Sequence, residues 1–465
     1  MSGGDYESFV SSKLAHVPPS GFECDKAWPF LFDFQRDLVR WALRRGRAAV
    51  FANTGLGKTR MQLTWADEVS RREGRPVLIY APLAVAQQTV DEAADIGIGA
   101  VVARDQSQCG DSMIVVTNYD RAHLFDPADF CGVVLDESSI IKHHDSKTLA
   151  RLLEAWNDHA HKLCCSATPA PNDWMELGTH AEFLGVCKRS EMLSEFFVHD
   201  GGETQKWRLK GHAKEAFWRW VSSWGALIRH PSDLGYDSTA FDLPELRVRD
   251  HVVDSGDAHK AAGFLFAGID LGGLAERRKA RRVTMTARVA KAADLVNATP
   301  GAWVVWCDLN AEGDALRKAI HEAVEIRGSD KISDKVDRLV RFAAGEIRVL
   351  VTKPKIAGFG LNWQHCRNVC FVGVTDSWEA YYQAVRRCWR FGQKEAVNVH
   401  IVTSDLEGNV LANLRRKDKL ATELAQQLAG ETAEAVRSQI VGAVRTTNEY
   451  NPRKIMEVPT WLVSI

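Results

Sequence analysis

The residue types best suited to chemistry lie in a glycine-containing stretch with the sequence "ANTGLGKT". It follows an apolar run and precedes a helical pattern, a context in which backbone N–H groups converge on phosphate oxygens at the positive end of a helix. Gly55 and Gly57 allow the backbone of this loop, which also contains Thr54, to approach a phosphate closely. Lys58 would reach the β- and γ-phosphates of a nucleotide, and the Thr59 hydroxyl would ligate Mg²⁺. We therefore interpret this loop as a nucleotide site.

A pair of carboxylates could supply the metal-binding and water-orienting groups that such a site requires. The stretch "GVVLDESS" places Asp136 and Glu137 at the end of an apolar strand, which would bring both side chains to the sheet edge beside the glycine loop. Asp136 would hold Mg²⁺ through water, and Glu137 would orient and polarise the attacking water. Further along, "CCSATP" puts Ser166, Ala167 and Thr168 after another strand, where small hydroxyl residues could couple the nucleotide state to a neighbouring lobe.

Positive charge opposite the γ-phosphate would come from a distant stretch, "QAVRRCWRFGQ". Phosphoryl transfer needs such charge to stabilise its transition state. Arg387 and Arg390 are three residues apart and share a helical face, and we include Gln383 of the same stretch among the nucleotide-binding candidates. On composition alone the two arginines could be surface residues. Because their helix belongs to a second α/β lobe without its own phosphate loop, we expect them to reach across a cleft, so that hydrolysis depends on lobe closure.

The elements that would position these residues alternate between apolar runs and helical patterns, as is typical of parallel sheets flanked by helices. The alternation extends to "KLCCSAT" and recurs after about residue 285, which predicts two α/β lobes. Between them, Trp218, Trp220 and Trp224 fit one helical face and are expected in the core. The expected divisions are an N-terminal segment over 1–29, an ATP-binding lobe over 30–184, a helical insertion and linker over 185–255, a second lobe over 256–405 and a helical tail over 406–465.

The composition limits the classes of protein that the chain can represent. With 465 residues, two or three domains are expected, and 45% hydrophobic residues are typical of a folded soluble protein. The net charge of −1 gives no overall attraction to nucleic acid, so any such surface must be a local patch. Ten cysteines without regular spacing favour reduced, mostly buried thiols. Because no apolar run reaches about 18 residues and the N-terminus lacks a basic-then-apolar signal, we expect a cytoplasmic protein.

Taken in order, these motifs resemble those of the superfamily-two helicases, and within them the Swi/Snf-like ATPases of DEAD/DEAH type. "FDFQ" is similar to the Q motif, "ANTGLGKT" to motif I, "APLAVAQQTVDEA" to motif Ia, "DESSIIK" to motif II and "SATPAPNDWMELG" to motif III. The most specific stretches are "IAGFGLNW", similar to motif V, and "QAVRRCWRFGQ", similar to motif VI. The resemblance covers roughly residues 30–405 and is greatest to compact phage-encoded members, which would place the protein in the cytoplasm of a host cell.

The resemblance implies an α/β fold of two RecA-like lobes, with a helical insertion and a helical C-terminal tail. ATP and Mg²⁺ would bind between the lobes, and nucleic acid would lie across both. It further implies that Gln35 reads the adenine base, and that Gly360 and Asn362 of motif V lie beside the nucleic-acid backbone and the lobe interface, with Gly360 also near the nucleotide. Arg390 would make the more direct γ-phosphate contact, with Arg387 as its partner.

The implied activity is an ATP-dependent motor that moves along DNA, duplex or forked, without reading its sequence. Two alternatives remain open from the sequence: an RNA helicase, and a nucleotide-dependent switch subunit that binds a protein partner.

One departure from the family pattern is Ser139, which stands where many relatives have a histidine. The connection between motifs II and III is therefore expected to differ.

Two basic stretches are candidate nucleic-acid contacts. The run "ERRKARRVTMTARVAK" is either a patch that follows a nucleic-acid strand or a solvated helix. The stretch "QKWRLKGHAK" places Trp207 between Lys206 and Arg208, and it could contact a duplex or stack on a base.

Overall fold

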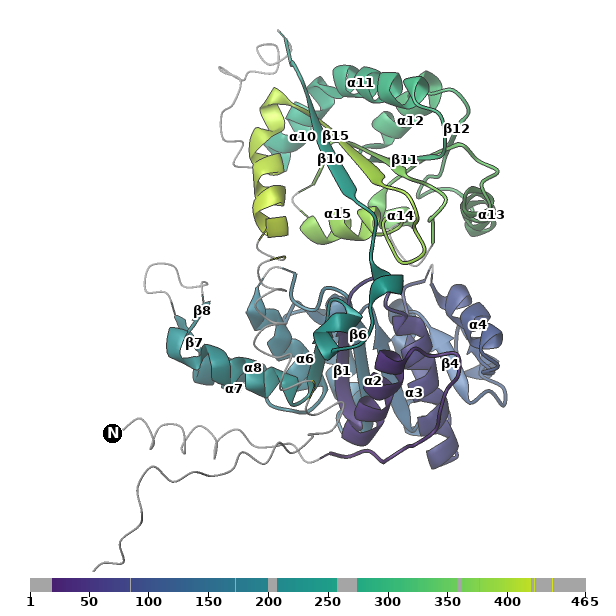
Figure 1. The fold of residues 1–465 in the computed structure, drawn as a ribbon, viewed down its shortest axis with the longest axis vertical. Coiled ribbons are helices and arrows are strands. Elements are labelled where there is room, and N and C mark those ends of the chain that lie inside the picture. The colour runs from purple at the N-terminus through teal and green to yellow at the C-terminus, as the bar shows by residue number, and fades with distance from the viewer. Residues whose placement is uncertain are drawn as a thin grey trace, which may run out of the picture.

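The computed structural model shows two α/β lobes, one below the other in Figure 1. It describes residues 19–83, 85–171, 173–199, 207–256, 274–357, 362–375, 377–419, 422 and 437. Residues 1–18 of the expected N-terminal segment, and most of the expected helical tail, lie outside the described residues. Among the described residues, no helix combines the length and the apolar character needed to cross a bilayer.

The first lobe is built on a seven-stranded parallel sheet with the order β3-β4-β2-β5-β6-β1-β9. Because all of its strands are parallel, their carboxyl ends meet at one edge, where the loops after β1, β5 and β6 come together. The strands are short apolar runs: β1 (Arg47–Ala52), β2 (Val77–Tyr80), β3 (Val101–Val102), β4 (Ile114–Thr117), β5 (Gly132–Asp136), β6 (His161–Ser166) and β9 (Gly225–Ile228).

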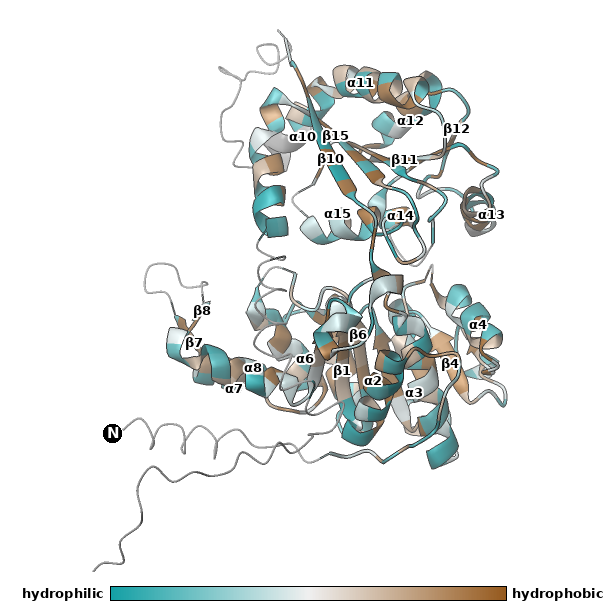
Figure 2. Ribbon diagram, in the orientation of Figure 1, coloured by the Kyte–Doolittle hydropathy of each residue, from teal (hydrophilic) through white to brown (hydrophobic). Residues whose placement is uncertain are grey.

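Helices cover both faces of this sheet, and each face has its own apolar cluster. One face is covered by α2 (Asp33–Arg45), α3 (Lys58–Glu73) and α4 (Ala86–Asp95), and the other by α5 (Lys147–Trp156), α6 (Leu177–Phe183), α7 (Arg189–Phe196) and α8 (Lys214–Ser222). Figure 2 shows the apolar strands inside the lobe and hydrophilic residues on the outward surfaces of the helices. An antiparallel hairpin of β7 (Phe197–His199) and β8 (Trp207–Leu209) projects at one side (Figure 1).

The second lobe has a six-stranded parallel sheet with the order β10-β15-β14-β11-β13-β12. Its strands are β10 (Leu246–Val253), β11 (Trp303–Cys307), β12 (Ala323–Glu325), β13 (Val349–Thr352), β14 (Asn368–Val372) and β15 (Val397–Ser404). Its helices are α10 (Leu274–Val283), α11 (Met285–Ala298), α12 (Asn310–Ala319), α13 (Ile332–Ala343), α14 (Pro354–Ala357) and α15 (Trp378–Val385). The expectation of two lobes with helix-flanked parallel sheets is therefore confirmed.

The range 185–255 differs from the helical insertion and linker that we expected. It contains α7 and α8, but β9 joins the first sheet beside β1, and β10 pairs with β15 in the second sheet. Both strands were obscured in the sequence, because β9 is only four residues long and β10 is rich in charged residues. Trp218, Trp220 and Trp224 are all buried in the core, as expected.

Part of the basic run at 276–291 forms buried ion pairs rather than a nucleic-acid surface. Arg288 Nη2 lies 2.7 Å from Glu312 Oε1, and both side chains are fully buried. Arg281 Nε lies 3.0 Å from Glu407 Oε1 inside the same lobe. These two arginines are therefore part of the core of the second lobe, so neither of the two alternatives, a patch that follows a strand or a solvated helix, describes them.

For the other basic residues of this run, contact with nucleic acid stays a prediction. Arg282 and Lys291 are exposed, whereas the side chains of Arg277 and Arg278 lie outside the described residues.

All ten cysteines are free thiols, most of them buried.

The ion pair of Arg288 and Glu312 gives a prediction for stability. Glu312→Leu leaves a buried guanidinium with less compensating charge, so thermal or denaturant unfolding should show the second lobe destabilised by about 3 kcal/mol. The double variant Arg288→Met/Glu312→Leu should recover most of that loss, and Glu346→Ala, in an exposed pair with Arg341, should change stability by less than about 0.5 kcal/mol. Wild-type stability of Glu312→Leu would contradict this account.

Candidate nucleotide site between the lobes

The phosphate loop connects β1 to α3, and two glycines set its shape. Gly57 caps α3 with φ 75° and ψ 35°, and Gly55 has φ 95°, conformations that L side chains rarely adopt. The Lys58 ammonium donates hydrogen bonds to the backbone carbonyls of Ala52 at 2.8 Å and Asn53 at 3.4 Å. The left-handed glycines therefore give the loop a shape that suits a phosphate, and the Lys58 ammonium is hydrogen-bonded to the backbone of the same loop.

Gln35, in the first turn of α2, lies buried behind this loop and holds it. Its Nε2 donates to the carbonyl oxygen of Leu56 at 2.8 Å, and its Oε1 accepts from the N–H of Phe32 at 3.0 Å. A Cβ at position 57 would lie only 2.3 Å from this Nε2, so Gly57 and the glutamine fit each other closely. In this arrangement Gln35 braces the loop, and its reading of adenine stays a prediction.

The two predicted carboxylates lie at the end of β5. Asp136 ends the strand and is buried, and the Tyr119 hydroxyl donates to its backbone carbonyl at 2.6 Å. Burial and the neighbouring charge of Glu137 raise the pKa of Asp136, while the Lys58 ammonium opposes that shift. Glu137 Oε2 is buried and has no hydrogen-bond partner among the described residues. The carboxylates of the buried Asp136 and the half-buried Glu137 lie beside a phosphate loop that carries a hydroxyl group, and this set of oxygen ligands fits a hydrated Mg²⁺.

Glu137 has a left-handed backbone, with φ 50° and ψ 52°. For a residue with a Cβ this conformation costs on the order of 1–2 kcal/mol, so the surroundings must impose it. The next residue, Ser138, is fully buried, and its hydroxyl lies 3.1 Å from Nε2 of His180 on α6.

His180 is neutral because burial lowers its pKa to about 4. Its Nδ1 lies 3.4 Å from the backbone carbonyl of Glu176, which can only accept, so the ring proton belongs on Nδ1 and Nε2 accepts from Ser138. Position 139, where the resemblance would place a histidine, holds a serine, and a histidine from α6 contacts the neighbouring Ser138. The sequence contained no local signal for this contact, since 42 residues separate its two partners.

Arg387 and Arg390 enter the site from the second lobe, directly after α15. Burial lowers the pKa of Arg387 to about 9 and that of Arg390 to about 10. Glu137 opposes the shift of Arg387, and Glu92 on α4 opposes that of Arg390. Burial also lowers the pKa of Lys58, which the carboxylate of Glu137 opposes. The two lobes thus bring these predicted groups together in one set of opposite charges, in which Arg387 is buried and the other side chains are half-buried.

Glu92 is a site residue that sequence reasoning missed. Its Oε1 lies 3.5 Å from Arg60 Nε, and burial raises its pKa against the opposing charges of Arg60 and Arg390 and a hydrogen bond with Thr59. Thr59, the predicted Mg²⁺ ligand, therefore lies beside an acidic side chain of α4. Within a helical pattern, nothing in the spacing distinguished Glu92 from the other acidic residues of that helix.

The backbone around the two arginines is hydrogen-bonded to the stretch that resembles motif V, which ends at Trp363. The N–H of Trp363 donates to the carbonyl of Arg387 at 3.0 Å. Gln393 Nε2 donates to the carbonyls of Gln364 at 2.9 Å and Cys388 at 3.2 Å. These bonds fix the segment that follows α15 to the core of the second lobe.

Three further residues were predicted to lie near the nucleotide or the lobe interface: Gln383, Asn362 and Gly360. Gln383 is buried on α15, within one turn of Arg387, and Asn362 is exposed. Gly360 lies outside the described residues.

Beside the phosphate loop is a cavity of about 310 Å³ between the lobes, with a lining that includes Thr54, Gly55, Arg229, Phe241, Arg386 and Phe391.

The second lobe matches a known family. Residues 289–392 match the model described as "Helicase conserved C-terminal domain", a segment that includes both arginines. The chain thus combines a fold of two α/β lobes, with a phosphate loop in the first, and a segment of the second lobe that is similar to the helicase C-terminal domain.

One known protein is similar to about a third of the chain, and one solved structure aligns with most of it. "Putative protein p41" of Acyrthosiphon pisum secondary endosymbiont phage 1 is 30% identical over 180 residues, an alignment that spans 34% of this chain and only 39% of that protein. The Sulfolobus solfataricus SWI2/SNF2 ATPase core, solved in complex with dsDNA, aligns with 88% of this chain and 96% of its own, at 18% identity and a TM-score of 0.41.

The buried His180 predicts a pH dependence. A folded-state pKa of about 4, against an ordinary 6.5, means that the unfolded chain binds an extra proton in this window, so stability is lost as the pH falls from about 6.5 towards 4. The loss from this one group is about 3 kcal/mol at most. His180→Gln should reduce the fall in unfolding midpoint over this range, whereas His144→Gln, at an exposed position, should not. Equal pH profiles for wild type and His180→Gln would refute the assignment.

Proposed function

We propose that this chain is an ATP-driven motor of the Swi/Snf-like type that moves along DNA, duplex or forked, without reading base sequence. The observation that carries the proposal is the set of buried and half-buried opposite charges formed by the phosphate loop and carboxylates of the first lobe and the arginines of the second. Such a site is complete only while the lobes are in contact, which ties nucleotide chemistry to lobe movement.

Each residue has a distinct role in this proposal. Backbone N–H groups of the phosphate loop and the Lys58 ammonium hold the nucleotide phosphates, and Thr59 and Asp136 hold Mg²⁺. Mg²⁺, when bound, neutralises phosphate charge and fixes the geometry of the transferred group. Glu137, with its unpartnered Oε2, orients the attacking water and accepts its proton.

Arg387 and Arg390 stabilise the charge that develops on the γ-phosphate. The charges of Glu137 and Glu92 act on these two guanidinium groups, so phosphate oxygens would compete with the carboxylates for them. Hydrolysis and phosphate release would then let the lobes separate, and each cycle would shift the grip of one lobe along the nucleic acid.

DNA is the proposed track because the motifs V and VI resemble those of the duplex-DNA branch of the superfamily, and the helicase domain at residues 289–392 is consistent with a nucleic-acid motor. The net charge of −1 means that binding must come from local phosphate contacts rather than from an overall field. Such contacts position a protein without reading bases.

The direct test is ATP turnover at constant salt, without polymer and then with duplex, single-stranded or forked DNA, or RNA. Duplex or forked DNA should stimulate wild-type turnover, and Lys58→Ala should lower it by roughly a thousandfold because the phosphate charge loses its partner. Lys318→Ala, at an exposed position on α12, should behave as wild type.

Three other outcomes would overturn parts of this proposal. Stimulation by RNA alone would make the protein an RNA helicase. Stimulation by none of the polymers would favour a nucleotide-dependent switch that acts on a protein partner. Unchanged turnover of Lys58→Ala would refute the nucleotide site itself.

A further inference from the structure

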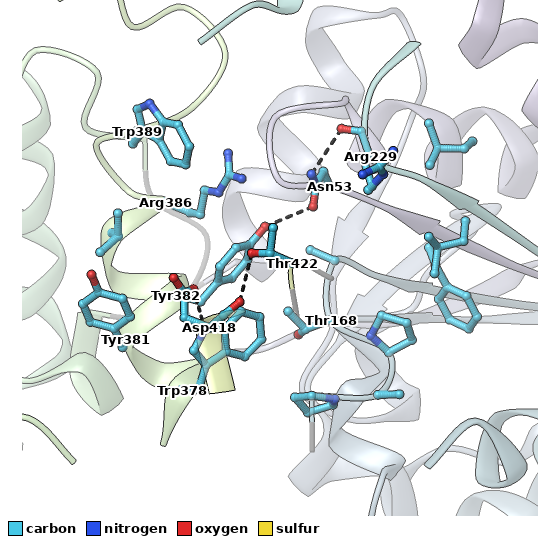
Figure 3. Close-up of a pocket in the computed structure, with 18 of the residues that line it drawn as sticks. Asn53, Thr168, Arg229, Trp378, Tyr381, Tyr382, Arg386, Trp389, Asp418 and Thr422 are labelled. Carbon is cyan, nitrogen blue, oxygen red and sulfur yellow. Dashed lines mark hydrogen bonds between the residues drawn. The ribbon is translucent and has the colours of Figure 1, made fainter. Parts of the chain in front are cut away.

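Helix α15 is the element of the second lobe that leads into the two arginines, and one of its faces meets the first lobe. Glu379 and Tyr382 lie three residues apart, so their side chains share that face. Figure 3 shows Tyr382 extending from this helix towards Asn53, with Thr168 of the first lobe nearby. Nothing in the sequence motifs had singled out either residue of α15.

Glu379 contacts two different loops of the first lobe. Its Oε2 accepts a hydrogen bond from the ammonium of Lys142, at the end of the turn that follows Glu137, and the two side chains are only 21% and 17% exposed. Its Oε1 accepts from the hydroxyl of Thr168, in the loop after β6, at 3.4 Å. One carboxylate therefore joins the loops that follow β5 and β6 to the second lobe.

Tyr382 extends the same connection to the phosphate loop. Its hydroxyl donates to Asn53 Oδ1 at 3.1 Å, and Asn53 Nδ2 donates to the backbone carbonyl of Arg229 at 3.1 Å. Thr168, Asn53 and Tyr382 all line a cavity of about 400 Å³ between the lobes (Figure 3). Because the lobes meet beside an open space, specific polar contacts rather than continuous packing hold their relative position at this point.

The position of α15 makes these contacts relevant to catalysis. The helix ends at Val385, and Arg387 follows two residues later in a turn that is bonded to Trp363. A displacement of the Glu379 end of this short helix would therefore move the guanidinium groups of Arg387 and Arg390 relative to Glu137.

We propose that Glu379 is a positioning residue that couples the loops after β5 and β6 to the placement of Arg387 and Arg390. The inference rests on the proposed function, because it assigns Glu379 a role in the same ATP site. Among the described residues, Glu379 has no hydrogen bond or ion pair with the phosphate loop or the two catalytic carboxylates; it acts through Lys142 and Thr168.

The test measures kcat and the KM for ATP of the full-length chain, with the most stimulating nucleic acid. Glu379→Gln should lower kcat about tenfold and leave KM within about twofold, because nucleotide binding is not altered. Lys142→Gln, on the other lobe, should give the same defect, and the double variant Lys142→Gln/Glu379→Gln should be no worse than either single change. The charge swap Lys142→Glu/Glu379→Lys should restore at least a third of the lost rate.

Glu395→Gln is the matched control, since its carboxylate pairs with Arg367 on the exposed surface of the same lobe and should leave both constants unchanged. Wild-type kcat in Glu379→Gln, or additive losses in the double variant, would overturn the proposal. A joint fall of kcat, ATP affinity and melting temperature would also overturn it, because that pattern indicates a structural role. Failure of the proposed function is distinguishable, since wild-type protein would then show no turnover that depends on Lys58.

Discussion

Two arginines of the second lobe, the buried Arg387 and the half-buried Arg390, lie at its contact with the first lobe, and their charges constrain the rest of the site. A guanidinium removed from water is costly unless opposite charge compensates it, and the compensating carboxylates here belong to the other lobe. The charge of Glu137 opposes the lowered pKa of Arg387, and the charge of Glu92 opposes that of Arg390, so carboxylates of the first lobe partly compensate the arginines of the second. Opposite charges of the two lobes therefore act on one another at this contact, and the proposed motor relies on nucleotide phosphates competing for the same arginines.

The first lobe keeps its half of the site rigid by local means. The parallel sheet brings the loops after β1, β5 and β6 to one edge, and buried polar contacts then set each loop: Gln35 behind the phosphate loop, and His180 against Ser138. The strained backbone of Glu137 lies between these supports, consistent with a residue whose geometry is imposed for chemistry rather than stability. The second lobe instead presents its arginines from a turn after a short helix, whose position depends on contacts with its neighbour.

The sequence predicted those parts of the molecule that depend on local patterns. The phosphate loop was readable because left-handed turns require glycine and because an apolar strand precedes it, and Asp136 was readable as the end of a buried strand. Glu92, His180 and Glu379 were not, because each acts through a partner that is distant in sequence or lies on an ordinary helical face. The strands β9 and β10 were missed for a related reason: their place in a sheet is set by β1 and β15, not by a strong pattern of their own.

The central claim, that the second lobe supplies catalytic charge to a site in the first, is tested most directly by removing that charge. The measurement is the rate of ATP hydrolysis by Arg387→Ala and Arg390→Ala, together with the affinity of each variant for ATP, with Arg367→Ala at an exposed position as the control. The account predicts a loss of about a hundredfold or more in hydrolysis with ATP affinity largely retained, because the arginines act on the transition state. Full nucleic-acid-stimulated turnover in both variants, with unchanged ATP binding, would contradict it.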